Sequence, residues 1–179
     1  PPSVNDDELP SQATTWSPSE LELWRSTAGA FDPSEKRGTE RRRSAKPSPK
    51  LVSVIMPTTE TRQCYHELVW SVFSSQTWVE KELIVVETYT RAPSPFFAAR
   101  APFIDDLVHV SMKESADAKM TTGLKRNIGI HVAQGSLIMH FDDDDLYAPN
   151  YIDMMVRALI ELEAPAVKLS SWWMVDLTQ

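Results

Sequence analysis

The chain has 179 residues, of which 42% are hydrophobic and 24% are charged, a balance that supports one core of ordinary size with attached segments. No apolar run approaches the ~20 residues of a membrane span, and no signal-peptide pattern opens the chain, so we expect a cytoplasmic chain without a transmembrane segment. The single cysteine, Cys64, excludes an internal disulfide framework and a cysteine zinc cluster.

Charge is distributed unevenly along the chain. Residues 1–50 carry 8 basic and 8 acidic side chains, whereas residues 51–179 carry 10 basic and 17 acidic ones, so the net charge of −7 lies in the second part. A negative field disfavours nonspecific binding of nucleic acid and suits a cation instead. We therefore expect no nucleic-acid partner.

Residues 1–50 are predicted to be an N-terminal extension, because they hold 7 of the 13 prolines. Ser17 and Glu20 have the spacing of a capping box, and Pro18 stands at the first helical position. This pattern predicts a short helix near 18–28 that packs on the main domain. Residues 32–50, with three consecutive arginines at 41–43, indicate a solvated basic linker.

Residues 51–179 alternate between apolar runs typical of buried strands and segments with apolar residues at helical spacing. The alternation implies an α/β fold, with a Rossmann-like, mostly parallel sheet that has right-handed crossovers and is flanked by helices. The segment 89–106, with three prolines, is predicted to be mostly loop. The predicted strands are 51–56, 83–86, 107–110, 136–141 and 166–172, and the predicted helices are 61–76, a segment from Thr122 to a stop at Gly135, and one opened by Pro149 and Asn150.

Apolar residues at helical spacing predict the buried face of each helix. Cys64 is interpreted as inert core packing on the first of these faces, and His140, on the fourth strand, as a packed core histidine. The three predicted faces are Cys64, Leu68, Val72 and Phe73; Leu124, Ile128 and Val132; and Ile152, Met155, Val156, Leu159 and Ile160.

Polar side chains follow three of the predicted strands at their carboxyl ends. Thr58 and Thr59 follow the first strand, Glu87 follows the second, and four aspartates at 142–145 follow the fourth. In open parallel sheets this edge is where ligands bind. We therefore expect the functional site here.

Four adjacent carboxylates repel one another, and a divalent cation would remove the conflict. Because strand side chains alternate, Asp142 and Asp144 should point to one side and Asp143 to the other. Carboxylate oxygens suit magnesium or manganese, which complete their shell with water and phosphate oxygens. The alternative is an acidic surface turn before a helix, where acids favour the helix dipole, and Asp145 fits that role.

Five segments in order resemble the family 2 glycosyltransferases, which use the A-type fold that binds nucleotide-diphospho-sugars. The resemblance covers about residues 51–176, the nucleotide-binding portion of that family's domain. It implies a donor that is a nucleoside-diphosphate sugar, uridine-linked, and an acceptor that is a glycan, lipid or protein. The five segments are 52–58, 71–77, 82–87, 123–129 and 135–149, the last with its Asp-x-Asp block.

The resemblance also implies roles for individual residues around the nucleotide. Pro57, Thr58 and Thr59 would line the base pocket. Glu87 stands where the family usually has Asp and would recognise base or ribose, while Asp143 would approach the ribose.

Further residues would serve the diphosphate. Lys125 and Arg126 would lie toward the diphosphate or the base, and Asp142 and Asp144 would bind Mn²⁺ or Mg²⁺. The metal would bridge the two phosphates and stabilise the leaving nucleoside diphosphate. The reaction implied is an inverting transfer of the sugar to an acceptor hydroxyl.

The family's catalytic base normally lies well beyond the metal motif, and this chain ends at Gln179, 35 residues after Asp144. Asp176 is too early for that role, so the catalytic base is left unassigned and we expect a chain truncated at its C-terminal end or a degenerate member. One alternative is therefore a non-catalytic nucleotide-sugar-binding or scaffold module. A nucleotidyltransferase is disfavoured because 58–62 contains no glycine, and a phosphatase because Thr58 replaces the nucleophilic Asp.

Overall fold

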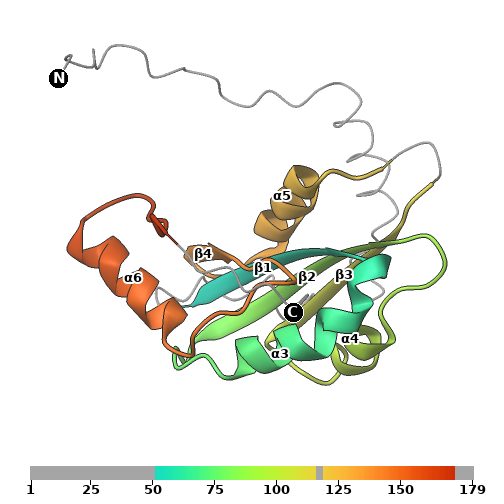
Figure 1. Cartoon of the computed structure of the whole chain (residues 1–179), viewed down its shortest axis with the longest axis horizontal. Coiled ribbons are helices and arrows are strands. Elements are labelled where there is room, and N and C mark those ends of the chain that lie inside the picture. Colours follow the sequence, from blue (N-terminus) through green and yellow to red (C-terminus); the bar gives the residue numbers. More distant parts are fainter. Residues whose placement is uncertain (1–50, 116–118, 172–179) are drawn as a thin grey trace, which may run out of the picture.

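The computed structural model describes residues 51–115 and 119–171. The predicted helix near 18–28 and the basic linker lie outside the described residues. The described part forms a sheet of four strands, all paired in parallel, in the order β3-β2-β1-β4 (Figure 1). The strands are β1 (Val52–Thr59), β2 (Lys81–Tyr89), β3 (Leu107–Lys113) and β4 (Leu137–His140). The predicted α/β class and parallel sheet are confirmed.

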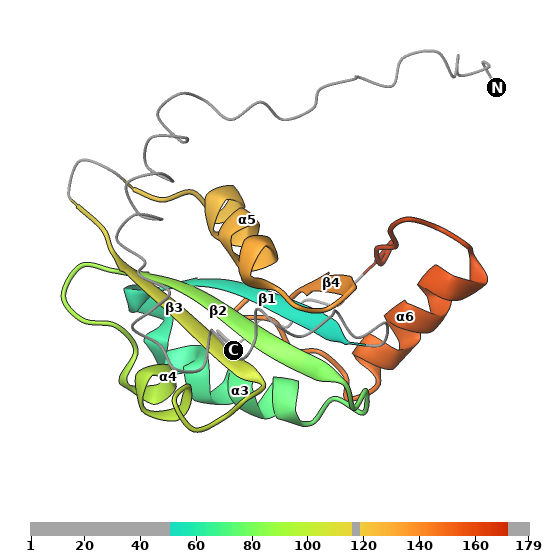
Figure 2. The same cartoon turned by 180° about the vertical axis from the view of Figure 1, so that it is seen from behind.

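Helices cover both faces of this sheet. Figures 1 and 2, which view the molecule from opposite sides, place α5 on one face and α3 with α4 on the other, while α6 lies beyond β4. The helical elements are the 3₁₀ helix η2 (Glu60–Tyr65), α3 (His66–Ser74), α4 (Pro95–Arg100), α5 (Thr122–Val132) and α6 (Tyr151–Glu161). The chain adds β2 and then β3 on one side of β1, and it then returns to add β4 on the other side of β1. The order in which strands are added therefore reverses at β1.

The main core lies on the sheet face that α3 and α4 cover. Strand residues that alternate along β1 and β2 point into it together with side chains of α3, α4 and α6, because neighbours in a parallel ladder share a face. Its buried members are Val52, Val54, Met56, Val69, Phe73, Leu83, Val85, Phe97, Leu107, Phe141, Ile152 and Val156.

On the opposite face of the sheet, α5 lies directly on β1. A Cβ built on Gly129 would lie 2.4 Å from Cγ2 of Ile55, so the helix approaches the strand more closely than any side chain allows. Gly135 has a similar role. A Cβ built on Gly135 would lie 2.5 Å from the carbonyl oxygen of Leu51. The sequence predicted that Gly135 ends the helix, but α5 already ends at Val132.

β1 continues to Thr59, beyond Pro57, which the sequence suggested as the end of the strand. The carbonyl of Ile55 accepts from Phe141 N at 3.1 Å, and pairing with β4 ends there. Pro57 is the next residue whose backbone nitrogen faces the β4 side, where no strand is paired any longer. The lack of an N–H at Pro57 therefore costs no hydrogen bond of the sheet.

The predicted helix 61–76 is divided, and this shifts its buried face. The first turn is the 3₁₀ helix η2, whose tighter winding changes the phase of the residues that follow. As a result Cys64 is exposed rather than packed, and Leu68 is 47% exposed. The core face of α3 is carried instead by His66, Val69 and Phe73.

Other expectations fail at the periphery. His140 is exposed rather than packed, because β4 is an edge strand whose outward face α5 does not cover. Residues 166–171 form no strand, and residue 172 lies outside the described part. In α6, Ile160 is exposed while Ile152, Met155 and Val156 are buried. The segment 89–106 contains the short helix α4, whose N-cap is Ser94.

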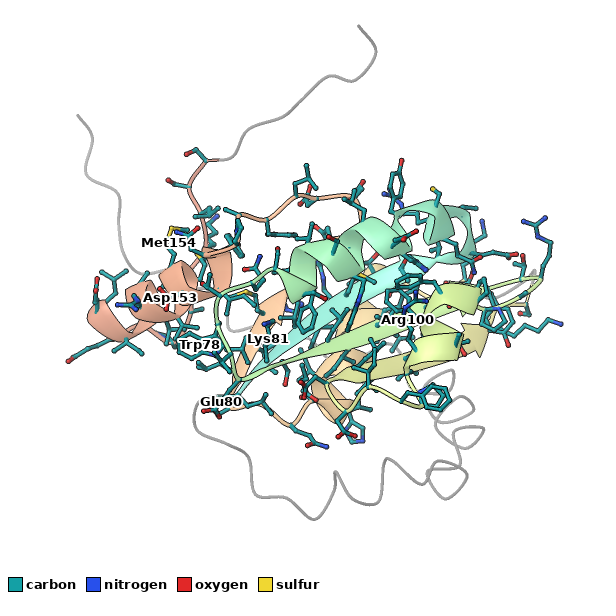
Figure 3. The ribbon with its side chains drawn as sticks, turned by 90° about the horizontal axis from the view of Figure 1, so that it is seen from below. Trp78, Glu80, Lys81, Arg100, Asp153 and Met154 are labelled. Carbon is teal, nitrogen blue, oxygen red and sulfur yellow. The ribbon has the colours of Figure 1, made fainter. Side chains whose placement is uncertain are left out.

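The end of the sheet opposite the expected site is closed by the segment that leads into β2. Figure 3 shows Trp78 and Glu80 on this segment and Lys81 at the first position of β2, with Asp153 and Met154 of α6 beyond them. Lys81 Nζ donates to the carbonyls of Gln76 and Trp78, at 2.9 Å each. These bonds satisfy a half-buried ammonium group within the chain itself.

Candidate active site

The polar residues that the sequence placed at one sheet edge do lie together there. Thr58 of β1 is paired with Glu87 of β2, and the Thr58 hydroxyl donates to Oδ2 of Asp143 at 2.6 Å. Thr58 and Asp143 therefore lie on either side of the point where the strand order reverses. That point is the usual ligand crevice of open parallel sheets.

The aspartates differ in burial, but not by the predicted strand alternation, because β4 ends at His140, before the acidic turn. Asp143 and Asp144 both contact Arg62, whereas Asp142 contacts Arg126. Asp143 is buried, whereas the side chains of Asp142 and Asp144 are about half exposed, at 50% and 48%. Burial raises the pKa of Asp143, against the opposing effects of the Thr58 hydrogen bond and the Arg62 charge. A protein environment thus holds one carboxylate inward and presents two outward.

Each outward carboxylate has an arginine partner. Arg126 Nη2 bonds Oδ1 of Asp142 at 2.8 Å, and Arg62 Nη1 bonds Asp144 and lies 3.3 Å from Oδ1 of Asp143. The hydrogen bond to Asp144 raises the pKa of Arg62, with a further contribution from the charge of Asp143. Arg126 was predicted at this site, whereas Arg62 was not.

The acidic turn is held by an aromatic stack that the sequence analysis did not identify. Tyr147 lies flat on the buried ring of Phe141, with centroids 3.9 Å apart, and its hydroxyl accepts from the Asp142 backbone N–H at 2.9 Å. Burial raises the pKa of Tyr147, so the hydroxyl stays protonated. Asp142 is therefore fixed by its backbone even though its side chain faces solvent.

Lys125 approaches the same edge from the α5 side of the sheet. Its ammonium group is buried and donates to the backbone carbonyl of Thr58 at 2.7 Å. Burial lowers the pKa of Lys125, while the charges of Glu114, Asp143 and Glu87 oppose that shift. The ammonium group of Lys125 is thus fixed at the carboxyl end of β1.

Glu87 is fully buried and accepts hydrogen bonds from three residues. The donors are Gln63 Nε2 at 2.7 Å, His109 Nε2 at 2.7 Å and the Ser94 backbone N–H at 2.8 Å. Burial alone would raise its pKa, but the bonds from His109, Ser94 and Gln63 outweigh burial and hold the pKa below its usual range. Glu87 therefore ties η2, β3 and the start of α4 together under the site.

His66 is a second buried polar residue that the sequence did not mark. Its Nδ1 lies 2.8 Å from Ser94 Oγ, and its Nε2 lies 3.0 Å from Thr58 Oγ1. Burial lowers the pKa of His66 to about 4, so the ring is neutral near pH 7. No local sequence signal could have found it, because its partners are 8 and 28 residues away and meet it only in the folded sheet.

A divalent ion could be held here only by carboxylates acting together with phosphate oxygens and water. No group of three His, Cys, Asp or Glu side chains within residues 51–115 and 119–171 could by itself hold a metal. Magnesium in nucleotide sites, however, is commonly held by one or two carboxylates together with phosphate oxygens and water. Asp142 and Asp144 supply two such carboxylates, both open to solvent.

Two comparisons with known proteins identify similar sequences. A family model described as glycosyl transferase family 2 matches residues 53–171. The putative glycosyltransferase EpsH of Bacillus subtilis (strain 168) is 31% identical over 107 residues, which make up 60% of this chain and 28% of EpsH. This chain thus matches under a third of the length of that relative.

In the described ranges, no helix has the length and apolar character needed to span a bilayer. The family match covers β1 to the end of α6 and includes every site residue discussed above. The chain therefore belongs to glycosyltransferase family 2.

Proposed function

We propose that this domain binds a uridine-diphosphate sugar with Mn²⁺ or Mg²⁺ and transfers the sugar, with inversion, to a hydroxyl group of a glycan, lipid or protein. The observation that carries the proposal is the hydrogen bond between Thr58 and Asp143, which joins the carboxyl ends of the neighbouring strands β1 and β4. Two exposed carboxylates and three cationic side chains lie around this bond, and in open parallel sheets ligands commonly bind at this edge, which supports the proposal.

In this proposal the outward carboxylates hold the ion. Asp142 and Asp144 would bind it, and the ion, when bound, supplies electrophilic stabilisation of the leaving diphosphate. An ion that neutralises these carboxylates would free Arg62 and Arg126 from their present partners. The guanidinium groups would then be available to phosphate oxygens, which they bind with two parallel hydrogen bonds.

The nucleoside would lie over the ends of β1 and β2. Asp143 would approach the ribose, and Pro57, Thr58 and Thr59 would line the base pocket. The resemblance implied that Glu87 recognises base or ribose, but its carboxylate is fully buried and bonded to Gln63, His109 and Ser94. Glu87 would therefore support this pocket from below. Lys125 would place its positive charge under the diphosphate.

The transfer itself balances as a single displacement. The acceptor oxygen forms a bond to the anomeric carbon while the bond from that carbon to the diphosphate oxygen breaks, and the bond electrons leave with the diphosphate. A base takes the proton of the acceptor hydroxyl. We assign that base to none of the described residues.

A second candidate is a binding module that works without metal. It is favoured by one observation, the pairing of Asp142 and Asp144 with arginines, which compensates their charge within the chain. Such a module would bind the nucleotide sugar but would not turn it over.

Calorimetric titration of the chain with UDP, with and without Mn²⁺, separates the candidates. Binding that requires Mn²⁺ supports the proposed transferase site, and slow hydrolysis of the UDP-sugar without acceptor would add support. Equal binding with and without Mn²⁺ favours the second candidate. Absence of binding in both conditions, for a chain shown to be folded by circular dichroism, overturns both.

A further inference from the structure

His66 is a buried histidine next to the candidate site that the proposed reaction does not use. The side chain has no solvent exposure and lies between Ser94 at the start of α4 and Thr58 at the end of β1. It is too deep to reach a nucleotide. Any contribution to the site must therefore pass through Thr58.

The hydrogens in this cluster can be counted. The Thr58 hydroxyl has one hydrogen, which it donates to Oδ2 of Asp143, so Thr58 Oγ1 must accept from His66. The hydrogen of the neutral ring is therefore on Nε2. The Nδ1 atom is left as an acceptor and receives the hydroxyl hydrogen of Ser94.

The Ser94 end of the chain is consistent with this assignment. Ser94 Oγ accepts from Phe97 N at 3.4 Å, as the N-cap of α4, and the Ser94 backbone N–H donates to Glu87. Its hydroxyl hydrogen is therefore free to point at His66. Each hydroxyl or ring hydrogen from Ser94 through His66 to Thr58 points toward Asp143.

This direction determines how Asp143 presents its carboxylate. Oδ2 is held by Thr58, which leaves Oδ1 facing Arg62 at 3.3 Å on the open side of the site. Without an N–H at His66 Nε2, the Thr58 hydroxyl would be free to rotate away. Asp143 would then lose the bond that fixes its orientation.

The geometry points to His66 as a positioning residue: as the Nε2–H tautomer it holds the Thr58 hydroxyl on Asp143 and so orients that carboxylate for the ribose. The orientation toward a ribose rests on the proposed function, whereas the tautomer does not. A purely structural role is the contrasting explanation, because His66 also packs against Phe97 with ring centroids 4.8 Å apart.

The tautomer can be measured without any nucleotide. Nitrogen-15 NMR of histidine-labelled chain at pH 7 should show His66 neutral, with Nε2 protonated and Nδ1 unprotonated. A ring protonated on Nδ1, or on both nitrogens, overturns the inference. The NMR measurement tests the tautomer even if UDP fails to bind. Failure of UDP to bind would overturn only the proposed function.

Two amide replacements test the role in binding. Gln places its amide nitrogen near the position of Nε2, whereas Asn reaches only to the position of Nδ1, and both remove the ring from Phe97. In Mn²⁺, we expect His66→Asn to weaken UDP binding about tenfold and His66→Gln to stay within about threefold of the wild-type chain. Equal weakening by the two variants overturns the inference, because only Gln keeps an N–H donor near the position of Nε2.

A matched pair separates the Thr58 bond from general loss of a buried hydroxyl. Ser53 Oγ donates to Glu82 Oε1 at 2.6 Å, the same length as the Thr58–Asp143 bond, but at the opposite end of β1. Thr58→Val should weaken UDP binding about tenfold, whereas Ser53→Ala should lower stability and leave UDP binding unchanged. Equal weakening of UDP binding by both variants overturns the positioning role.

Discussion

The side chain of Asp144 is half exposed, pairs with Arg62 and lies between two other aspartates. These features determine how its replacement should affect stability and ion binding. Its ion pair with Arg62 is solvent-exposed, and such pairs contribute about 0–1 kcal/mol to stability. Its removal also relieves repulsion from Asp143 and Asp145. The residue should therefore matter far more for the ion than for the fold.

We expect Asp144→Asn to weaken UDP binding in Mn²⁺ at least about tenfold and to change the free energy of unfolding by less than about 1 kcal/mol. Calorimetry and urea unfolding measure the two quantities. Asp145→Asn is the matched control, since Asp145 adjoins the same turn but contacts Tyr147 only at 3.4 Å. Normal UDP binding by Asp144→Asn would show that the metal assignment is wrong.

His66 gives the fold a pH dependence whose direction follows from its environment. Burial, with a smaller contribution from the charge of His109, lowers its pKa to about 4, although the charge of Glu87 acts in the opposite direction. An unfolded histidine titrates near pH 6.5, so between these values the unfolded chain binds more protons. Stability from this residue is complete above about pH 6.5 and is lost as the pH falls toward 4.

We expect this loss to be about 2 kcal/mol between pH 7 and pH 5. In His66→Gln, the difference between the free energies of unfolding at pH 7 and pH 5 should shrink by about that amount, as measured by urea unfolding at both pH values. An unchanged difference in His66→Gln would exclude a buried neutral ring.

At the scale of elements, α5 carries two glycines, of which only Gly129 lies against the sheet. Gly129 allows the helix to lie on Ile55, whereas a Cβ at Gly123 would meet only Thr121 Oγ1, at 4.0 Å. The helix carries Lys125 and Arg126 to the site, so its distance from the sheet sets where those cations lie.

Gly129→Ala should therefore lower the free energy of unfolding by about 1–3 kcal/mol, because α5 must move away from β1. Gly123→Ala, in the same helix but in open space, should be neutral or stabilising by up to about 1 kcal/mol. Urea unfolding measures both. Equal effects of the two substitutions would contradict the close packing of α5 on Ile55.

The elements that the sequence predicted well are those with continuous apolar runs. β1 and β2 appear where expected because burial on both faces needs such runs, and the shorter apolar run 107–110 marked the start of the edge strand β3. The position of Asp142 and Asp144 at the carboxyl edge of the sheet followed from their place after β4. The predicted phase of α3 was wrong because a 3₁₀ turn precedes the helix. The strand predicted at 166–172 was wrong over residues 166–171, which pair with no strand in the described part of the chain. Arg62 and His66 were missed because their contacts with the site depend on tertiary packing: Arg62 meets Asp144 across 82 residues.

At the scale of the whole molecule, ligand binding should appear as added stability, because only the folded sheet brings Thr58, Glu87 and Asp143 together. UDP with Mn²⁺ at one hundred times its dissociation constant should add about 2.7 kcal/mol to the free energy of unfolding, or about 5–10 °C in melting temperature. Differential scanning calorimetry measures the shift. The same UDP concentration with EDTA should give little or none, and equal shifts would favour the metal-independent module.

Thr58 engages both layers of the molecule through one residue. Its carbonyl oxygen accepts from Lys125 on the α5 side, while its hydroxyl contacts His66 and Asp143 on the α3 side. The two helical layers are therefore cross-linked at the end of β1 and should move there as a single body. A nucleotide bound as we propose would therefore rest on a rigid floor, and any closure over it would come from the chain beyond Thr59 and Asp143.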